Sequence, residues 1–213
     1  MVKEHAYRPK RQHKPMQKKR FFSPGMMVGI FLGMLMVGSM FGFIASYTSG
    51  GDQNALVYNG FKFTQTRYGY ATEVEGTQFE FSYAPQSVEY INISKDIINA
   101  LSSANAVVIT YDDESMINQS GALVQFNLGQ LYEEVLGAYV TRALVNNSRF
   151  DTMEQADCDS ATQFVPVIKI VQGETTSVTR QGDCFIMSAL NDLDMIRLQD
   201  RLSYGLVGVI KDV

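Results

Sequence analysis

The feature that most constrains this chain is the absence of charge from Phe21 to Gly51. Within this run, Met26 to Ala45 gives twenty mainly apolar residues, and about 20 are needed to cross the hydrocarbon core of a bilayer. A cleaved signal peptide has a shorter apolar core that ends in a small-x-small site. The best cut, after Ala45, would place Phe43 where a small residue is required. We therefore predict an uncleaved transmembrane signal anchor over residues 21–48.

The two flanks of this segment differ in charge, and this difference predicts its orientation. Residues 1–20 carry eight Lys and Arg residues against one acid, Glu4, a net charge of +7, whereas the first basic residue on the other side is Lys62. Because basic flanks stay in the cytoplasm, we predict a single-pass protein of the cell membrane with a cytoplasmic N-terminus and an extracytoplasmic C-terminal domain. The tail is a solvated flank or, alternatively, binds anionic membrane lipid.

Small residues recur along the predicted anchor at four-residue spacing, with one phase shift, at Gly25, Gly29, Gly33, Gly38 and Gly42. Such a stripe allows two helices to approach closely, and close packing drives helix association in lipid. The spacing predicts a homo-oligomer or a protein partner held through this helix. The alternative is that glycine is simply common in membrane helices.

Residues 49–54 read as a short polar linker, and residues 55–213 as one folded domain. Beyond the tail the chain holds 10 basic and 21 acidic side chains, a net charge of −11, which argues against a nucleic-acid partner. Both histidines, His5 and His13, lie in the tail. The domain therefore lacks the usual general base and zinc ligand, which argues against most hydrolases and metalloenzymes.

The domain begins with two hairpin signals, Asn59-Gly60 and Glu75-Gly76. Both residues of an Asn-Gly pair tolerate the positive φ angles of a type I′ turn. Phe79, Phe81 and Tyr83 alternate with polar residues, which predicts one buried face. The four strands are expected at residues 55–58, 61–66, 70–74 and 77–83.

Helical and strand patterns then alternate. We expect a helix capped by Ser94, a second helix at residues 120–136, and a last helix capped by Asn191 or Asp192 with its apolar residues inward. Buried strands are expected at residues 106–111, 138–145, 165–171, 177–179 and 184–188. This order predicts parallel crossovers. The predicted fold is therefore α/β, with one mixed sheet and helices packed on it.

Cys158 and Cys184 are the only cysteines, and both follow the predicted anchor. An even count in an extracytoplasmic domain predicts a disulfide. A redox or metal-binding pair is the alternative, but the domain supplies no histidine to complete a metal site.

Three sequons stand in the domain, at Asn92, Asn118 and Asn146, and predict possible glycosylation sites. Two of their hydroxyl residues, Ser94 and Ser120, are also placed to begin helices, which is the alternative interpretation.

One acidic cluster, Asp112, Asp113 and Glu114, directly follows the predicted strand at residues 106–111. Ligands of open α/β sheets bind beyond the carboxyl ends of parallel strands, and oxygen ligands there suit Mg²⁺ or Ca²⁺. The alternative is an acidic turn before a helix N-terminus. The sequence contains no GxSxG, Ser-x-x-Lys or phosphate-loop motif. It therefore predicts no catalytic residue, no cofactor and no small-molecule substrate.

Several segments of the domain resemble a group of uncharacterised single-pass membrane proteins of small-genome archaea. They are Phe61 to Phe63, Phe79 to Pro85, Val107 to Thr110, the cysteine pair around Val165 to Ile168, and Asp200 to Gly205. The resemblance implies the same membrane topology and disulfide, and it assigns no catalytic residue.

Two functions are compatible with these patterns. The first is a membrane-anchored interaction module or accessory subunit of a cell-surface assembly. The second is a carboxylate-based, metal-dependent enzyme or binder that uses the acidic cluster.

Overall fold

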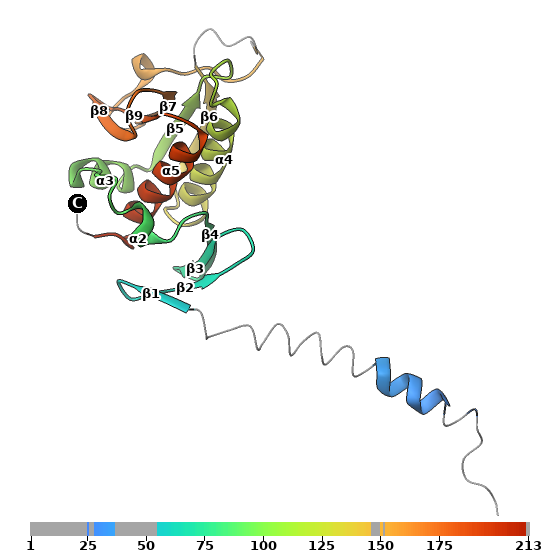
Figure 1. Cartoon of the computed structure of the whole chain (residues 1–213). Coiled ribbons are helices and arrows are strands. Elements are labelled where there is room, and N and C mark those ends of the chain that lie inside the picture. The colour runs from blue at the N-terminus through green and yellow to red at the C-terminus, as the bar shows by residue number, and fades with distance from the viewer. Residues whose placement is uncertain (1–24, 26–27, 37–54, 146–149, 151, 212–213) are drawn as a thin grey trace, which may run out of the picture. The chain divides into compact units, whose positions relative to one another are not determined.

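The computed structural model describes residues 25, 28–36, 55–145, 150 and 152–211, and the chain divides into two compact units, Met1–Gly50 and Gly51–Val213 (Figure 1). In the first unit, residues 28–36 are helical, uncharged and exposed. Among the described residues, no helix has both the length and the apolar character that a membrane crossing needs. Most of the predicted anchor, including Gly38 and Gly42, lies outside the described residues.

The second unit begins with a four-stranded antiparallel sheet in the order β1-β2-β3-β4. At both predicted turns the φ angles are positive, 47° and 87° at Asn59-Gly60 and 50° and 84° at Glu75-Gly76. The two predicted hairpins are therefore confirmed. The strands are β1 (Ala55–Tyr58), β2 (Phe61–Gln65), β3 (Tyr70–Val74) and β4 (Thr77–Phe81).

A separate five-stranded sheet follows, in the order β6-β5-β7-β9-β8. Its pairs are parallel except for the antiparallel edge strand β8, as the predicted crossovers require. The expectation of one mixed sheet is wrong. The next strand after β4 is β5, which is already flanked by β6 and β7 and so has no free edge for β4. The strands are β5 (Ala106–Tyr111), β6 (Tyr139–Leu144), β7 (Val167–Gln172), β8 (Ser177–Gln181) and β9 (Cys184–Ala189).

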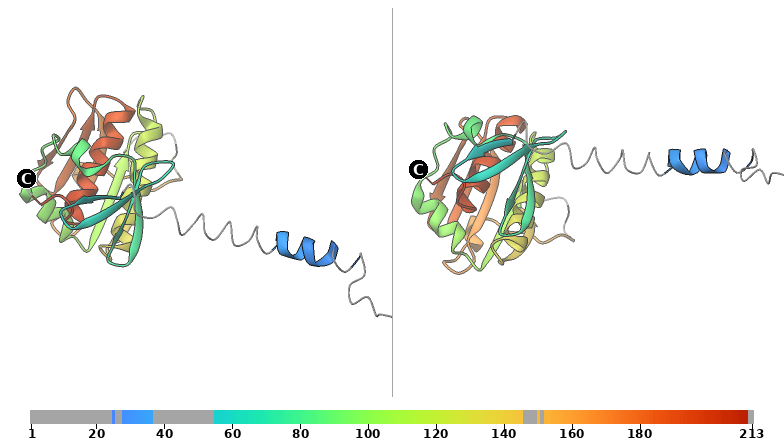
Figure 2. Two further views of the ribbon diagram at one scale, coloured as in Figure 1. Left: turned by 60° about the horizontal axis from the view of Figure 1, so that its bottom comes forward. Right: turned by 90° about the horizontal axis from the view of Figure 1, so that it is seen from below.

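Helices α4 and α5 lie side by side against one face of this sheet, and α3 packs on α5 (Figures 1 and 2). Asn191 caps α5 by accepting a hydrogen bond from the Asp194 N–H at 3.0 Å. Ser94 stands at the predicted cap of α3 but its side chain makes no capping hydrogen bond. The helices are α2 (Pro85–Val88), which the sequence did not predict, α3 (Lys95–Ser102), α4 (Asn118–Glu134), α5 (Asp192–Leu206) and the 3₁₀ turn η1 (Cys158–Ser160).

The core has two clusters, and α5 contributes to both. In the larger cluster, Leu128 of α4 and Leu198 of α5 pack with side chains from one face of the five-stranded sheet. In the smaller, the ring of Tyr204 lies 4.3 Å from Phe81 and 5.8 Å from Phe63, measured between centroids. Burial of these aromatic rings fixes the four-stranded sheet against the end of α5.

The opposite face of the five-stranded sheet carries a covalent and an ionic attachment. Cys158 and Cys184 form a disulfide, which confirms the predicted pairing. Next to it, Lys169 Nζ donates to the two carboxylate oxygens of Asp157 at 2.6 and 2.8 Å. Lys169 and Cys184 alternate in register with the core-facing residues, so both point to this second face. Together they attach η1 to the sheet.

Candidate functional site

The predicted acidic cluster lies in the loop between β5 and α4. Asp112 Oδ1 accepts a hydrogen bond from the Glu114 N–H at 2.9 Å, which closes a local turn. Asp113 is buried and lines a shallow pocket of about 270 Å³ with Tyr111 and Asn118. Burial, followed by the nearby Asp113 charge, raises the pKa of Tyr111. Among the described residues, no group of three or more His, Cys, Asp or Glu side chains is placed to hold a metal ion, so the predicted metal site stays a prediction.

The sequons differ in their surroundings. Asn92 is exposed between α2 and α3. Asn118 is half-buried as the first residue of α4, and its Nδ2, the atom that a glycan would modify, donates to the Asp113 carbonyl at 3.1 Å. Ser120 is buried and donates back to the Ile117 carbonyl at 3.0 Å. The structure therefore favours Asn92 over Asn118 as a glycan acceptor, while Asn146 lies outside the described residues.

A groove of about 400 Å³ lies between the four-stranded sheet and the helices of the domain. One wall is the stretch Gln78 to Ser82, which comprises most of β4 and the residue after it. The other wall belongs to α4 and α5. Tyr68 of the β2–β3 loop stands at the rim, and the helical residues of the lining are Leu123, Asn127, Gln130, Leu131, Glu134, Gln199 and Ser203. The groove thus joins segments that are far apart in the sequence.

The groove follows the edge of β4 rather than one of its faces. Successive residues of a strand point to opposite faces of the sheet, yet all residues from Gln78 to Ser82 contribute to the lining. β4 is the last strand in its sheet, with β3 as its only neighbour among the described strands. The unpaired side of a sheet edge therefore lines this groove.

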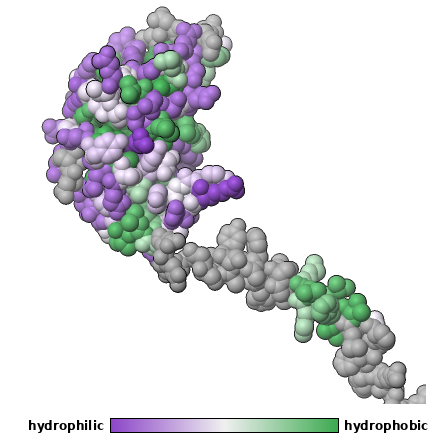
Figure 3. All heavy atoms as spheres, in the orientation of Figure 1, coloured by the Kyte–Doolittle hydropathy of each residue, from purple (hydrophilic) through white to green (hydrophobic). Residues whose placement is uncertain are grey.

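A chain of side-chain amides holds the helical wall in place. Asn127 Nδ2 donates to Gln199 Oε1 at 3.0 Å, which links α4 to α5, and Gln199 Nε2 donates to Asp200 Oδ1 at 3.1 Å. Apolar surface stands beside this polar line, because Leu123 is 49% exposed and Phe126 of the next turn is 52% exposed. Figure 3 shows hydrophobic colour on the side of the domain where α4 lies. The wall therefore offers both hydrogen-bonding and apolar contacts.

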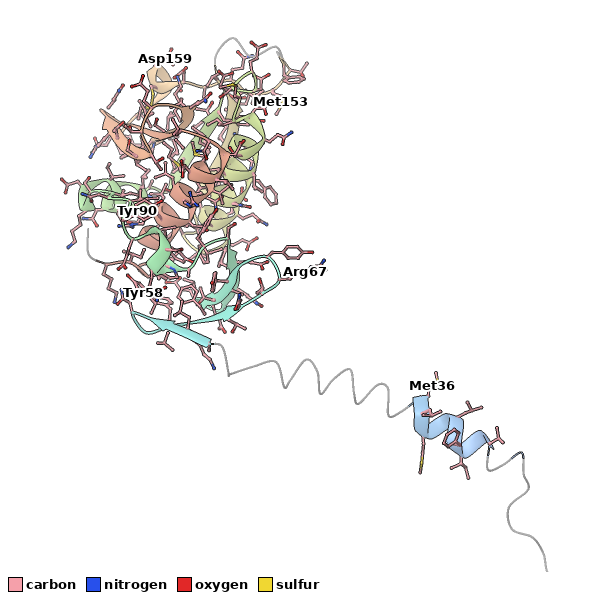
Figure 4. All side chains as sticks on the ribbon, in the orientation of Figure 1. Met36, Tyr58, Arg67, Tyr90, Met153 and Asp159 are labelled. Carbon is pink, nitrogen blue, oxygen red and sulfur yellow. A yellow bond between two sulfur atoms is a disulfide. The ribbon has the colours of Figure 1, made fainter. Side chains whose placement is uncertain are left out.

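The charged side chains that line the groove are both acidic. Glu80 lies on β4 and Glu134 at the end of α4, and both are exposed. Neither forms an ion pair within the described part of the chain, although Glu80 accepts a hydrogen bond from the Thr66 hydroxyl. Arg67, labelled in Figure 4, is outside the lining, and its guanidinium stacks 5.6 Å from the Tyr68 ring centroid. The groove therefore has an acidic character.

Behind the helical wall, Asp200 is fully buried on α5. Its Oδ2 accepts a hydrogen bond from the Tyr83 N–H at 2.8 Å, immediately after the β4 stretch of the groove. Burial raises the pKa of Asp200 to about 7, although the Tyr83 and Ser82 N–H groups act in the opposite direction. Asp200 thus fixes the distance between the two walls without lining the groove itself.

The sequence patterns did not identify this groove, because its walls are more than forty residues apart and share no motif. The signal that bears on it is the predicted strand at residues 77–83, which is followed by Pro85 and not by another hairpin. No protein-family model, curated protein or solved structure matches the chain.

Proposed function

We propose that the protein is a membrane-anchored, extracytoplasmic interaction module that serves as an accessory subunit of a cell-surface assembly. The observation that carries this proposal is the groove between β4 and α4, which presents an unpaired strand edge and exposed side chains of α4 together. Unpaired strand edges are surfaces that proteins either protect or use for association.

Two further observations support the cellular side of the proposal. The Cys158–Cys184 disulfide is of a kind that persists in oxidising compartments, which is consistent with an extracytoplasmic domain. Residues 28–36 form an uncharged helix whose large apolar side chains are all exposed, with Met36 at 78% and Met34 at 72%. Such a surface is suited to lipid or to a partner helix.

Membrane topology is tested by labelling single introduced cysteines in intact cells with a membrane-impermeant maleimide. Thr179→Cys lies on an exposed position of β8 and is expected to be labelled, whereas Gln12→Cys in the basic tail is expected to react only after lysis. Labelling of Gln12→Cys in intact cells would contradict the predicted orientation.

The interaction itself is tested by photo-crosslinking of the full chain in its native membranes. A photoreactive residue at Gln130, in the groove, is expected to give a discrete crosslinked product. The matched control places the same residue at Thr179, which is exposed but outside the groove lining. Identical products at the two sites, or none at Gln130, would contradict the proposal.

A further inference from the structure

We propose that the β4 groove binds an extended peptide segment that carries a Lys or Arg side chain, and that the peptide adds to β4 as a fifth strand. This inference rests on the proposed function and names the class of partner and the mode of binding. It follows from the edge of β4, with which no described strand pairs, from the helix opposite it and from the charge of the lining.

The hairpin geometry shows which backbone groups of β4 are open. In a two-residue hairpin loop the flanking residues form a hydrogen-bonded pair, here Val74 and Thr77. Pairs alternate along an antiparallel ladder, so Phe79 directs its N–H and C=O groups to β3. Gln78 and Glu80 form the intervening non-hydrogen-bonded pairs, and their N–H and C=O groups therefore point away from β3 and into the groove.

These open groups have the spacing that strand addition requires. A strand pairs through every second residue, and Gln78 and Glu80 are two positions apart. An extended peptide can therefore form up to four backbone hydrogen bonds here. Beyond this stretch the edge is closed, because the N–H groups of Ser82, the next open position, and of Tyr83 are both bonded to Asp200. Five residues of β4 span about 17 Å, so a segment of roughly five residues matches the site.

The helical wall complements such a peptide. Side chains on one face of the added strand would lie against α4, where the exposed Leu123 offers apolar contact and Gln130 offers an amide. A groove of about 400 Å³ accommodates a few side chains but no folded domain. Recognition of a peptide by an edge strand and a facing helix combines backbone affinity with side-chain specificity.

The charge of the lining defines the specificity. Glu80 and Glu134 are exposed, line the same groove, and form no ion pair within the described part of the chain. Among the described residues, no Lys or Arg belongs to the lining. An acidic peptide would be repelled, and a basic side chain would find a carboxylate on either wall. The geometry therefore assigns a basic, extended segment.

The probe for this test is a phage-displayed library of random twelve-residue peptides, selected on the full chain in detergent micelles with its disulfide intact. The selected sequences are expected to be enriched in Lys or Arg, and synthetic copies should bind with affinities that fall as salt rises. A library that yields no binder, or one enriched in acidic residues, would overturn the inference.

The binding mode is tested with proline. Gln78→Pro removes an N–H that points into the groove and leaves the β3–β4 ladder intact, and is expected to weaken peptide binding at least tenfold. Val57→Pro is the matched control. The Val57 N–H also points away from its neighbouring strand, but it lies on β1, at the opposite edge of the same sheet. Unchanged binding by folded Gln78→Pro would exclude strand addition. If that variant does not fold, N-methylation of alternate peptide amides tests the same bonds, and unaffected binding would again exclude it.

The charge is tested with the double variant Glu80→Gln and Glu134→Gln. We expect about tenfold weaker binding and a loss of salt dependence. Glu73→Gln, an exposed acid on β3 outside this lining, is the matched control and should bind as the wild type does. Equal effects of the two changes would show that net charge, and not the groove, attracts the peptide.

The crosslinking at Gln130 separates this inference from the proposed function. A product that forms equally in wild type and Gln78→Pro would leave the interaction module standing and discard strand addition. The absence of any product would discard the proposed function itself.

Discussion

The Tyr83 N–H donates a hydrogen bond to Asp200 Oδ2 at 2.8 Å, across 117 residues of sequence. One turn further along α5, the Tyr204 hydroxyl donates to the Tyr83 carbonyl at 2.6 Å. Both backbone groups of Tyr83 are thus held by side chains of a single helix. The chain that leaves β4 is therefore fixed to α5, and this attachment keeps the two walls of the groove together.

Asp200 is expected to make stability depend on pH. Its pKa is about 7 in the folded protein, against 3.8 ordinarily, so the folded state holds a proton that the unfolded state releases. The stability that the folded state gains by retaining this proton is complete below pH 3.8 and is lost as pH rises to 7. Because one pKa unit corresponds to about 1.4 kcal/mol, the loss amounts to about 4 kcal/mol.

Asp200→Asn should remove this dependence, since the amide oxygen can still accept from the Tyr83 N–H. Urea unfolding between pH 4 and 8 measures the slope, and the exposed Asp159→Asn serves as a control. If Asp200→Asn kept the wild-type slope over this range, the pH dependence would originate elsewhere.

Local sequence patterns predicted most elements of this fold, because turns and short strands depend on neighbouring residues. Asn59 and Glu75 adopt positive φ angles as their turns require, and Ala106–Tyr111 is the buried strand that its apolar run indicates. The division into two sheets could not be predicted in this way. It depends on which strands flank β5, and hence on contacts between segments far apart in the chain.

The site was harder to predict than the fold for the same reason. Gln78 and Glu80 read as ordinary exposed residues of a strand, and only the strand order shows that their backbone groups are open. Asp200 lies on the predicted last helix between the apolar residues Leu198 and Leu202. No feature of the neighbouring sequence indicates that its charged side chain is buried. The disulfide was predictable, because the sequence holds only two cysteines and the domain has no histidine to complete a metal site with them.

The disulfide should contribute substantially to stability. It joins residues 26 positions apart, and closing a loop of this size stabilises a fold by roughly 3 to 4 kcal/mol on the chain-entropy model. Replacing Cys158 and Cys184 with alanine should lower the free energy of unfolding by that amount. Reduction of the wild type should have a similar effect and should not affect the double variant. Two free thiols in mass spectrometry of non-reduced native protein would contradict the assignment.

The Asp157–Lys169 pair should make the free energy of unfolding fall as the pH is lowered into the acid range. This dependence on pH has the opposite sign to that of Asp200. Burial opposes ionisation of Asp157, but its bonds to Lys169 and the Cys158 N–H outweigh this and lower its pKa below 3.8. The stabilisation is therefore present above pH 3.8 and is lost as pH falls through the lower folded value. Lys169→Met should cost about 1 to 2 kcal/mol at pH 7 and reduce the acid-side slope. A full acid-side slope in Lys169→Met would contradict this role.

Two glycines of the apolar helix should support self-association. Gly29 and Gly33 are four residues apart and so share one face, and a Cβ added at either would meet no atom of the described chain. Replacing both with isoleucine should therefore block close approach of a second helix and lower the signal of a membrane dimerisation assay. Val28→Ile with Leu32→Ile changes a neighbouring face at the same spacing and should leave the signal unchanged. Equal signals from the two pairs would argue against a glycine interface.

Gly69, directly before β3, should tolerate no side chain. A Cβ there would overlap the carbonyl oxygen of Phe81 and lie 2.9 Å from its carbon, and both atoms belong to backbone that cannot move aside as a side chain would. Gly69→Ala should therefore destabilise the domain by about 2 kcal/mol or more, since it forces apart the end of the β3–β4 hairpin.

Gly182→Ala is the matched control. Gly182 has a φ of 63° but open space around it, so alanine there should cost only about 1 kcal/mol. Urea unfolding of both variants compares the two costs. If the cost of Gly69→Ala did not exceed that of Gly182→Ala, the close approach of Gly69 to Phe81 would not be required, and this end of the groove would be wider than described.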